Sequence, residues 1–105
     1  MGRVTGKKAF ITGGAQGLGA ASGMMLAKEG ALVTLADINE AGAKSVADQI
    51  NAVYPDKAFS VALDVTSEEE WKEALAYAND KMDGINVLFN NAGIGGGSTV
   101  EETDF

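Results

Sequence analysis

A glycine-rich segment, Thr12-Gly13-Gly14-Ala15-Gln16-Gly17-Leu18-Gly19, is the part of the chain best suited to bind phosphate groups. It follows a short apolar run and leads into a run with helical spacing, the context that a dinucleotide-binding turn requires. Gly13 allows a tight turn, Gly17 lets backbone N–H groups approach a pyrophosphate, and Gly19 lets the helix pack closely on the strands. The helix N-terminus adds partial positive charge. A glycine-rich turn without a ligand is the weaker alternative, because an acid follows about twenty residues later.

That acid is Asp37, at the end of a second apolar run. A carboxylate there can accept hydrogen bonds from both ribose hydroxyls of an adenosine, and it would repel a 2′-phosphate. Gln16, Ile38 and Asn39 carry no positive charge that could receive such a phosphate. The pattern therefore favours NAD over NADP. The alternative is that Asp37 only caps the next helix, as Asx residues often do.

Two further polar segments follow apolar runs. Asp64-Val65 can place a carboxylate against an adenine amino group and the valine backbone along the ring, and an ordinary loop aspartate is an equal alternative. Asn90-Asn91-Ala92-Gly93 opens with two asparagines, which are unfavourable in a strand but can tie strand ends together. Ala92 and Gly93 leave room for a ribose, and the alternative is a simple turn. All these segments follow strands, and doubly wound sheets bind ligands at the carboxyl ends of their strands.

An alternation of strands and helices must hold these segments. Short apolar runs predict buried strands at 8–12, 31–36, 58–63 and 85–89, and Gly30 is expected to end the helix that begins at Gly17. The other helices are one capped by Asn39, with an inner face of Ala43, Val46, Ala47 and Ile50, and one begun by a Ser67–Glu70 capping box, burying Trp71, Ala74, Leu75, Ala78 and Met82. Ser98–Glu101 resembles the start of another helix. The prediction is a doubly wound parallel α/β sheet of order 3-2-1-4 with helices on both faces.

The composition excludes several kinds of site. The 105 residues carry a net charge of −7 and no basic run, so we expect no binding of nucleic acid. They contain no histidine and no cysteine, which excludes disulfides, histidine-assisted nucleophiles and the usual zinc sites, and suits a cytoplasmic protein. No apolar stretch is long enough to cross a bilayer, so we expect no membrane partner.

Together the four segments resemble the short-chain dehydrogenase/reductase family. That family carries T-G-x-x-x-G-x-G after its first strand, an acid after the second when NAD is used, D-V after the third and N-N-A-G after the fourth. All four motifs are present in order and cover essentially the whole chain. The resemblance implies pyrophosphate and ribose contacts near the first motif, ribose and adenine contacts at the second and third, and nicotinamide-side contacts at the fourth. The implied cofactor-binding residues are Gly13, Gln16, Gly17, Leu18, Gly19, Asp37, Ile38, Asp64, Val65, Asn91, Ala92 and Gly93.

The resemblance also implies a Rossmann-type oxidoreductase that moves a hydride between NAD and a small-molecule alcohol or carbonyl compound, usually as a homo-oligomer (tetramer or dimer). The family's catalytic Asn, Ser and Tyr-x-x-x-Lys lie beyond N-N-A-G, so we expect no catalytic residue within residues 1–105. We expect these residues to form the N-terminal half of one dinucleotide-binding domain, truncated from a protein of about 250 residues. A fourth strand left as an uncovered sheet edge supports this expectation.

The sequence leaves two alternative interpretations of function, and it contains one false match to the family's Tyr-x-x-x-Lys motif. A non-catalytic nucleotide-binding fragment would carry the same motifs. A methyltransferase that uses S-adenosylmethionine predicts a different glycine loop and leaves Asn90-Asn91-Ala92-Gly93 unexplained. Tyr77 and Lys81 read Tyr-x-x-x-Lys, but they precede the fourth strand, on the solvated flank of a helix. There an i, i+4 surface pair is the better interpretation.

Overall fold

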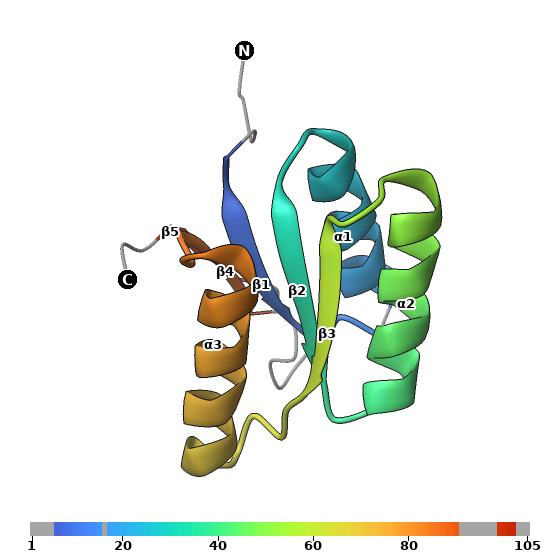
Figure 1. Ribbon diagram of the computed structural model, residues 1–105. Coiled ribbons are helices and arrows are strands. Elements are labelled where there is room, and N and C mark those ends of the chain that lie inside the picture. The colour runs from blue at the N-terminus through green and yellow to red at the C-terminus, as the bar shows by residue number, and fades with distance from the viewer. Residues whose placement is uncertain (1–5, 16, 91–98, 103–105) are drawn as a thin grey trace.

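The structure, a computed structural model, describes residues 6–15, 17–90 and 99–102. A single sheet runs through the middle of the molecule, with two helices on one side and one on the other (Figure 1). Its strand order is β3-β2-β1-β4-β5. The first four strands in chain order are parallel, so the predicted doubly wound arrangement of order 3-2-1-4 is confirmed. The elements are β1 Lys8–Thr12, α1 Gly17–Lys28, β2 Leu32–Asp37, α2 Glu40–Val53, β3 Ala58–Ala62, α3 Glu68–Met82, β4 Val87–Asn90 and β5 Thr99–Glu102.

The strand register brings the carboxyl ends of four strands to one edge of the sheet. Thr12 at the end of β1 is paired with Ala36 of β2 and with Asn90 of β4. Asp37, the last residue of β2, is paired with Ala62, the last residue of β3. The glycine-rich turn, Asp37 and the Asp64–Val65 segment therefore follow strand ends at one edge of the sheet, where β4 also ends at Asn90. This edge is the lower end of the sheet in Figure 1.

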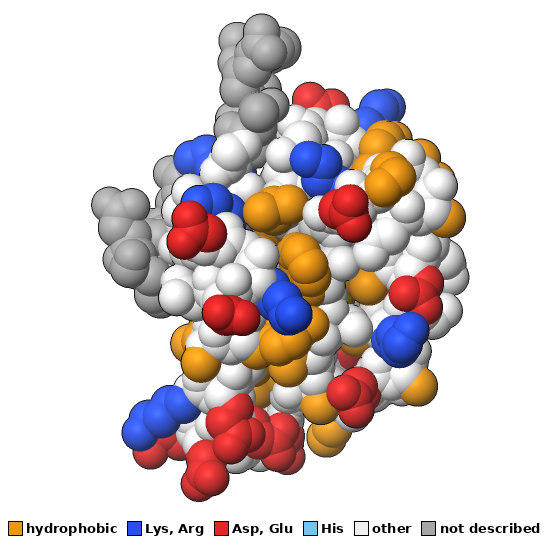
Figure 2. Space-filling model, in the orientation of Figure 1, with side chains coloured by type: hydrophobic (Ala, Val, Ile, Leu, Met, Phe, Trp, Pro, Cys, Tyr) orange, Lys and Arg blue, Asp and Glu red, His pale blue; other side chains and the backbone are white. Residues whose placement is uncertain are grey.

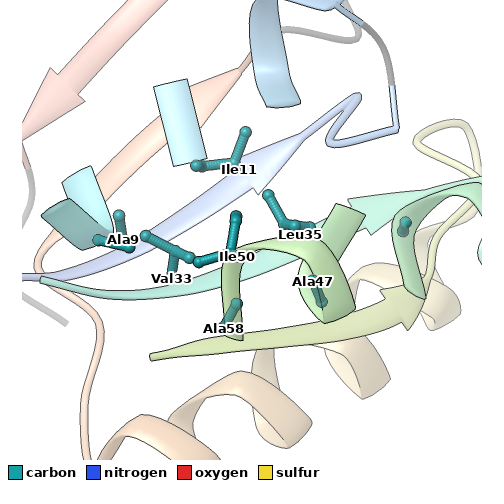
Figure 3. Packing of buried hydrophobic residues seen from close by; sticks show 9 residues of the cluster. Ala9, Ile11, Val33, Leu35, Ala47, Ile50 and Ala58 are labelled. Carbon is teal, nitrogen blue, oxygen red and sulfur yellow. The ribbon is translucent and has the colours of Figure 1, made fainter. Parts of the chain in front are cut away.

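Both faces of the sheet bury apolar side chains, which explains why the strands read as continuous apolar runs. On the α1/α2 face, Ile11, Val33 and Leu35 pack against Ile50 of α2 (Figure 3). On the α3 face, Phe10 and Ala36 lie in a cluster with Met82. Alternate residues of one strand thus pack into opposite cores. The two cores together exclude water from both faces of the sheet.

The helix ends follow the predicted chemistry, with one shift of bounds. Gly30 adopts a φ of 98° just after α1, where it allows the chain to reverse into β2. The Ala31 N–H donates to Leu26 and the Gly30 N–H donates to Ala27, the hydrogen-bond pair of a Schellman motif. The helix itself ends at Lys28, two residues before the predicted stop. Asn39 caps α2 as predicted, accepting from the Gly42 N–H at 3.0 Å.

The prediction for the segment 98–101 is wrong. Thr99–Glu102 forms β5, which pairs antiparallel with β4 rather than starting a helix. The sheet therefore has five strands rather than the predicted four, and β4 is not an uncovered edge. The physical reason is that β-branched Thr99 and Val100 favour extended backbone, and the unpaired N–H and C=O groups along β4 offer them a partner.

Candidate functional site at the carboxyl edge of the sheet

The glycine-rich turn is shaped by two adjacent glycines with different tasks. Gly13 has a φ of 69°, the left-handed conformation that the predicted tight turn needs. The Gly14 N–H donates to the Ala36 carbonyl at 3.1 Å, so the turn lies directly on β2. A Cβ at Gly14 would stand 2.6 Å from the Cβ of Leu35, closer than two carbon atoms can approach. No role was predicted for Gly14. Its position directly after Gly13, the glycine of the turn, is the sequence feature that indicates one.

The first turn of α1 presents its backbone to open space. Gly17 is exposed, and a Cβ there would meet nothing within 4 Å. Leu18 is 59% exposed, whereas Gly19 is buried. One turn on, a Cβ at Gly23 would meet Leu35 at 3.0 Å, so small residues on this side let α1 pack closely on the sheet. An unobstructed helix N-terminus is the geometry that accommodates a phosphate group.

Asp37 joins the glycine-rich turn to β2. Its side chain is buried, with 5% exposed, and its Oδ2 accepts a hydrogen bond from the Ala15 N–H at 3.0 Å. Its Oδ1 accepts from the Asn39 N–H at 2.9 Å. Since Asn39 is the N-cap of α2, the alternative of Asp37 as the helix cap is wrong. A carboxylate has about four acceptor positions, so these two contacts leave room for further donors. Ile38, the next residue, is 74% exposed.

Asp64 and Val65 leave β3 and precede α3 in a tightly bonded segment. Asp64 Oδ1 accepts from the Thr66 hydroxyl at 2.7 Å and from the Thr66 N–H at 3.0 Å. These two hydrogen bonds, the hydroxyl first, lower the pKa of the Asp64 carboxyl below its ordinary value, and partial burial opposes them. The Asp64 side chain is therefore an anion that is held in place at neutral pH.

The contribution of the Thr66 hydroxyl to the pKa of Asp64 can be tested by substitution. In Thr66→Val the strongest donor to Asp64 is lost, so the pKa of the carboxyl should rise toward its ordinary value. A lowered folded-state pKa adds stability above the unfolded pKa of about 4, and that stability is lost as pH falls through the folded pKa. The measurement is an NMR titration of the Asp64 carboxyl carbon. In Thr66→Ser, which keeps the hydroxyl, the Asp64 carboxyl should titrate as in the parent. An unchanged Asp64 pKa in Thr66→Val would show that the hydroxyl does not lower that pKa.

The capping box at α3 is only half formed. Ser67 Oγ accepts from the Glu70 N–H at 3.2 Å, as predicted. The Glu70 carboxylate does not return to the Ser67 N–H, which instead donates to the Asp64 carbonyl at 2.9 Å. Glu70 Oε1 accepts from the Asp64 N–H at 2.8 Å. The Ser67 N–H thus has a backbone acceptor, and the Glu70 carboxylate accepts instead from the N–H of Asp64, three residues before Ser67.

Four predicted site residues lie outside the described part of the chain: Gln16, Asn91, Ala92 and Gly93. In the described part, Thr12 links two strand ends, because its hydroxyl donates to the Phe89 carbonyl at 3.3 Å. This role of Thr12 was not predicted, because a threonine at a strand end can have many roles and has no characteristic spacing to a partner.

The part of the chain that the structure describes contains neither a cluster of metal-binding side chains nor a membrane-spanning helix. Within 6–15, 17–90 and 99–102, no three side chains of the metal-binding types gather closely enough to hold an ion. None of the helices in that part of the chain has the length and apolarity needed to span a bilayer.

Comparison with known proteins decides the family. Residues 7–105 match the model of the short chain dehydrogenase family. The chain belongs to this family. The 2,5-dichloro-2,5-cyclohexadiene-1,4-diol dehydrogenase of Sphingobium indicum is 47% identical over 92 residues, covering 88% of this chain and 36% of the relative. Trans-4-hydroxycyclohexanecarboxylate dehydrogenase of Sinomonas cyclohexanicum is 40% identical over 107 residues, covering 97% and 41%. The chain therefore spans well under half the length of these curated relatives.

Solved structures of short-chain dehydrogenases agree with the fold. Hydroxysteroid dehydrogenase from Escherichia coli superposes with a TM-score of 0.78 at 35% identity, covering 82% of this chain and 36% of that one. The 3-ketoacyl-(acyl-carrier-protein) reductase from Brucella melitensis, solved in complex with NADH, gives 0.76 at 35% identity, covering 81% and 34%. The similarity to these solved structures thus agrees with the family match.

Proposed function

We propose that this chain is the cofactor-binding part of an oxidoreductase that transfers a hydride between NAD and a small-molecule alcohol or its carbonyl counterpart. The observation that carries the proposal is the carboxylate of Asp37, which lies at the end of β2 and is hydrogen-bonded to the glycine-rich turn. A buried anion beside a phosphate-binding turn suits a ribose with free hydroxyls and opposes one with a 2′-phosphate. The NADH bound to the Brucella melitensis relative supports a nicotinamide cofactor in this fold.

In this proposal each segment of the carboxyl edge binds one part of the dinucleotide. Gly13, Gly17 and Gly19 form the turn and the helix start under the pyrophosphate, together with Gln16 and Leu18. Asp37 accepts from the ribose hydroxyls beside Ile38, and Asp64 and Val65 hold the adenine. Asn91, Ala92 and Gly93 are assigned to the nicotinamide side from their motif alone. The bound nicotinamide supplies the hydride-transfer chemistry, and the residues of this chain bind and orient the dinucleotide.

The proposed substrate class is a secondary alcohol on a carbon ring, or the matching ketone. Two of the similar dehydrogenases are named for a cyclohexadiene diol and a hydroxycyclohexane carboxylate, and others are named for hydroxysteroids. We further propose that residues 1–105 are the N-terminal half of one dinucleotide-binding domain. The support for this is the small share of the relatives that the chain covers, 36% and 41% in the two described above.

The test is alcohol-dependent reduction of NAD by the complete protein as the cell makes it, followed by the absorbance of the reduced nicotinamide. We expect turnover with cyclic secondary alcohols such as cyclohexanol derivatives, and little with straight-chain primary alcohols of the same carbon number. Turnover with primary alcohols only would contradict the substrate class. No turnover with any alcohol or ketone, by protein that binds NAD, would contradict the hydride-transfer proposal.

Tyr77 is expected to take no part in this chemistry. It lies in the second half of α3, at i, i+4 to Lys81, whose Nζ stands 5.8 Å from the ring centroid. The carboxyl edge of the sheet lies at the opposite end, where α3 begins (Figure 1). Proton transfer needs heavy atoms within about 3 Å of the substrate oxygen, directly or through one water. Tyr77→Phe should therefore change kcat by less than about twofold, whereas loss of a general acid costs about 10²–10⁴-fold. A hundredfold loss in a folded, NAD-binding variant would relocate the active site.

A further inference from the structure

Two consecutive residues of α3 hold the backbone of two consecutive residues after β3. Glu70 Oε1 accepts from the Asp64 N–H at 2.8 Å. The indole Nε1–H of Trp71 donates to the Val65 carbonyl at 2.8 Å. Glu70 accepts from the N–H of Asp64, and Trp71 donates to the carbonyl of Val65. The backbone is therefore held on both sides of the peptide bond that joins Asp64 to Val65. Neither contact was anticipated from the sequence, which gave Glu70 a cap role and Trp71 a core role.

Both side chains are themselves fixed by the fold. Ser67 caps α3 and accepts from the Glu70 N–H, which sets the first helical turn relative to the loop. The Trp71 ring lies 6.0 Å from the Phe10 ring, centroid to centroid, at 39°. Phe10 is fully buried in β1, the strand between β2 and β4. The indole therefore connects the Val65 carbonyl to the central strand of the sheet, and helix and sheet together determine where the loop backbone lies.

We propose that Glu70 and Trp71 are positioning residues for recognition of the adenine base. This rests on the proposed function, in which Asp64 accepts from the adenine amino group and Val65 lies along the ring. A recognition group that is already held in its bound geometry loses less freedom when the ligand arrives, so its hydrogen bond contributes more to affinity. Releasing the backbone at Asp64 or Val65 should therefore weaken recognition of the base rather than of the phosphates.

The experiment compares NAD with nicotinamide hypoxanthine dinucleotide, which has an oxygen in place of the adenine amino group. Dissociation constants for both are measured by calorimetry on the complete protein. The parent should prefer NAD by about tenfold, the value of one hydrogen bond to a charged acceptor. Glu70→Ala and Trp71→Phe should each reduce that ratio at least about threefold, since the contact weakens without vanishing. A general loss of stability would lower both affinities and leave the ratio unchanged.

Matched variants separate positioning from charge. Acidic side chains gather where α3 begins (Figure 2), and the exposed Glu69 is one of them. Glu69→Ala removes the same charge from the same turn and should keep the parent ratio. Glu70→Gln retains an acceptor oxygen and should keep most of the parent's preference for NAD. Hydrogen exchange of the Asp64 N–H should be faster in Glu70→Ala than in Glu69→Ala, which tests the contact even where Trp71→Phe folds poorly.

The outcomes distinguish this inference from the proposed function. A parent protein that binds neither dinucleotide overturns the proposed function and the inference with it. A parent that binds both equally overturns the contact between Asp64 and the adenine amino group, and the positioning role with it, but leaves NAD binding intact. An unchanged ratio in Glu70→Ala with unchanged exchange at Asp64 overturns the positioning role alone. A reduced ratio in Glu70→Ala and Trp71→Phe, with Glu69→Ala like the parent, is the result we expect.

Discussion

In the double variant Asp37→Ala, Ile38→Arg we expect NADP to bind more tightly than NAD, with the ratio of the two affinities shifted by about a hundredfold. The substitution at Asp37 removes a buried carboxylate that opposes a 2′-phosphate, and a guanidinium at the exposed position 38 attracts one. Titration of both cofactors under the same salt and pH measures the ratio. We also expect weaker absolute binding, because Asp37 accepts from the Ala15 and Asn39 N–H groups, which the alanine leaves without that acceptor.

Two controls separate these effects. Ile38→Arg alone should improve NADP binding only slightly, because the repulsive carboxylate is still present. Asp37→Asn keeps a side-chain oxygen that can accept from one of the two N–H groups, so it should lose less NAD affinity than Asp37→Ala. A double variant that retained the parent preference for NAD would show that Asp37 does not face the adenosine ribose.

The second large effect concerns Gly14 and Gly17, two glycines of the same segment. Alanine should lower stability at the first and NAD affinity at the second. Gly14→Ala places a methyl 2.6 Å from the Leu35 Cβ and 2.9 Å from its Cα, so the turn or β2 must move. Overpacking of this kind costs about 1–3 kcal/mol of stability. Gly17→Ala meets no protein atom within 4 Å, so the free energy of unfolding should hardly change. Its methyl stands where we place the pyrophosphate, and NAD affinity should fall at least about tenfold.

Thermal unfolding and NAD titration of both variants provide the measurement, and each variant is the control for the other. Gly14→Ala should lower the melting temperature. Gly17→Ala should keep the parent melting temperature without cofactor and lose most of the stabilisation that saturating NAD provides. If Gly17→Ala bound NAD as tightly as the parent, the phosphates would not lie over the start of α1.

Most of the fold could be predicted because several signals agreed at each element. The run Lys8–Thr12 was apolar, short and followed by glycine, and it forms β1 with those bounds. The inner face predicted for α2 is buried at Ala43, Ala47 and Ile50, with Val46 packed beside it. Thr99–Glu102 was different, because a single apolar residue among four shows no periodicity. Its pairing with β4 is a tertiary contact that local sequence does not encode.

The candidate site was predictable where the backbone geometry depends on residue type. Gly13 has the positive φ that its turn required, Asp37 is the last residue of β2 as assigned, and Asp64 lies two residues after the end of β3. What the sequence could not provide were the contacts between segments. The bonds from Ala15 to Asp37, from Asp64 to Glu70 and from Trp71 to Val65 depend on the packing of helix against sheet. The first joins residues 22 apart and the other two join residues six apart, and hydrogen bonds of this kind between a side chain and a distant backbone group leave no spacing pattern in the chain.

We expect the carboxyl edge of this sheet to bind NAD in preference to NADP, because the buried Asp37 carboxylate opposes a 2′-phosphate. The most direct measurement is a parallel calorimetric titration of the unaltered protein with the two cofactors at one pH and one ionic strength. NAD should bind at least about tenfold more tightly, since only NADP places a phosphate beside the buried carboxylate. Equal or tighter binding of NADP, or no binding of either cofactor, would contradict it.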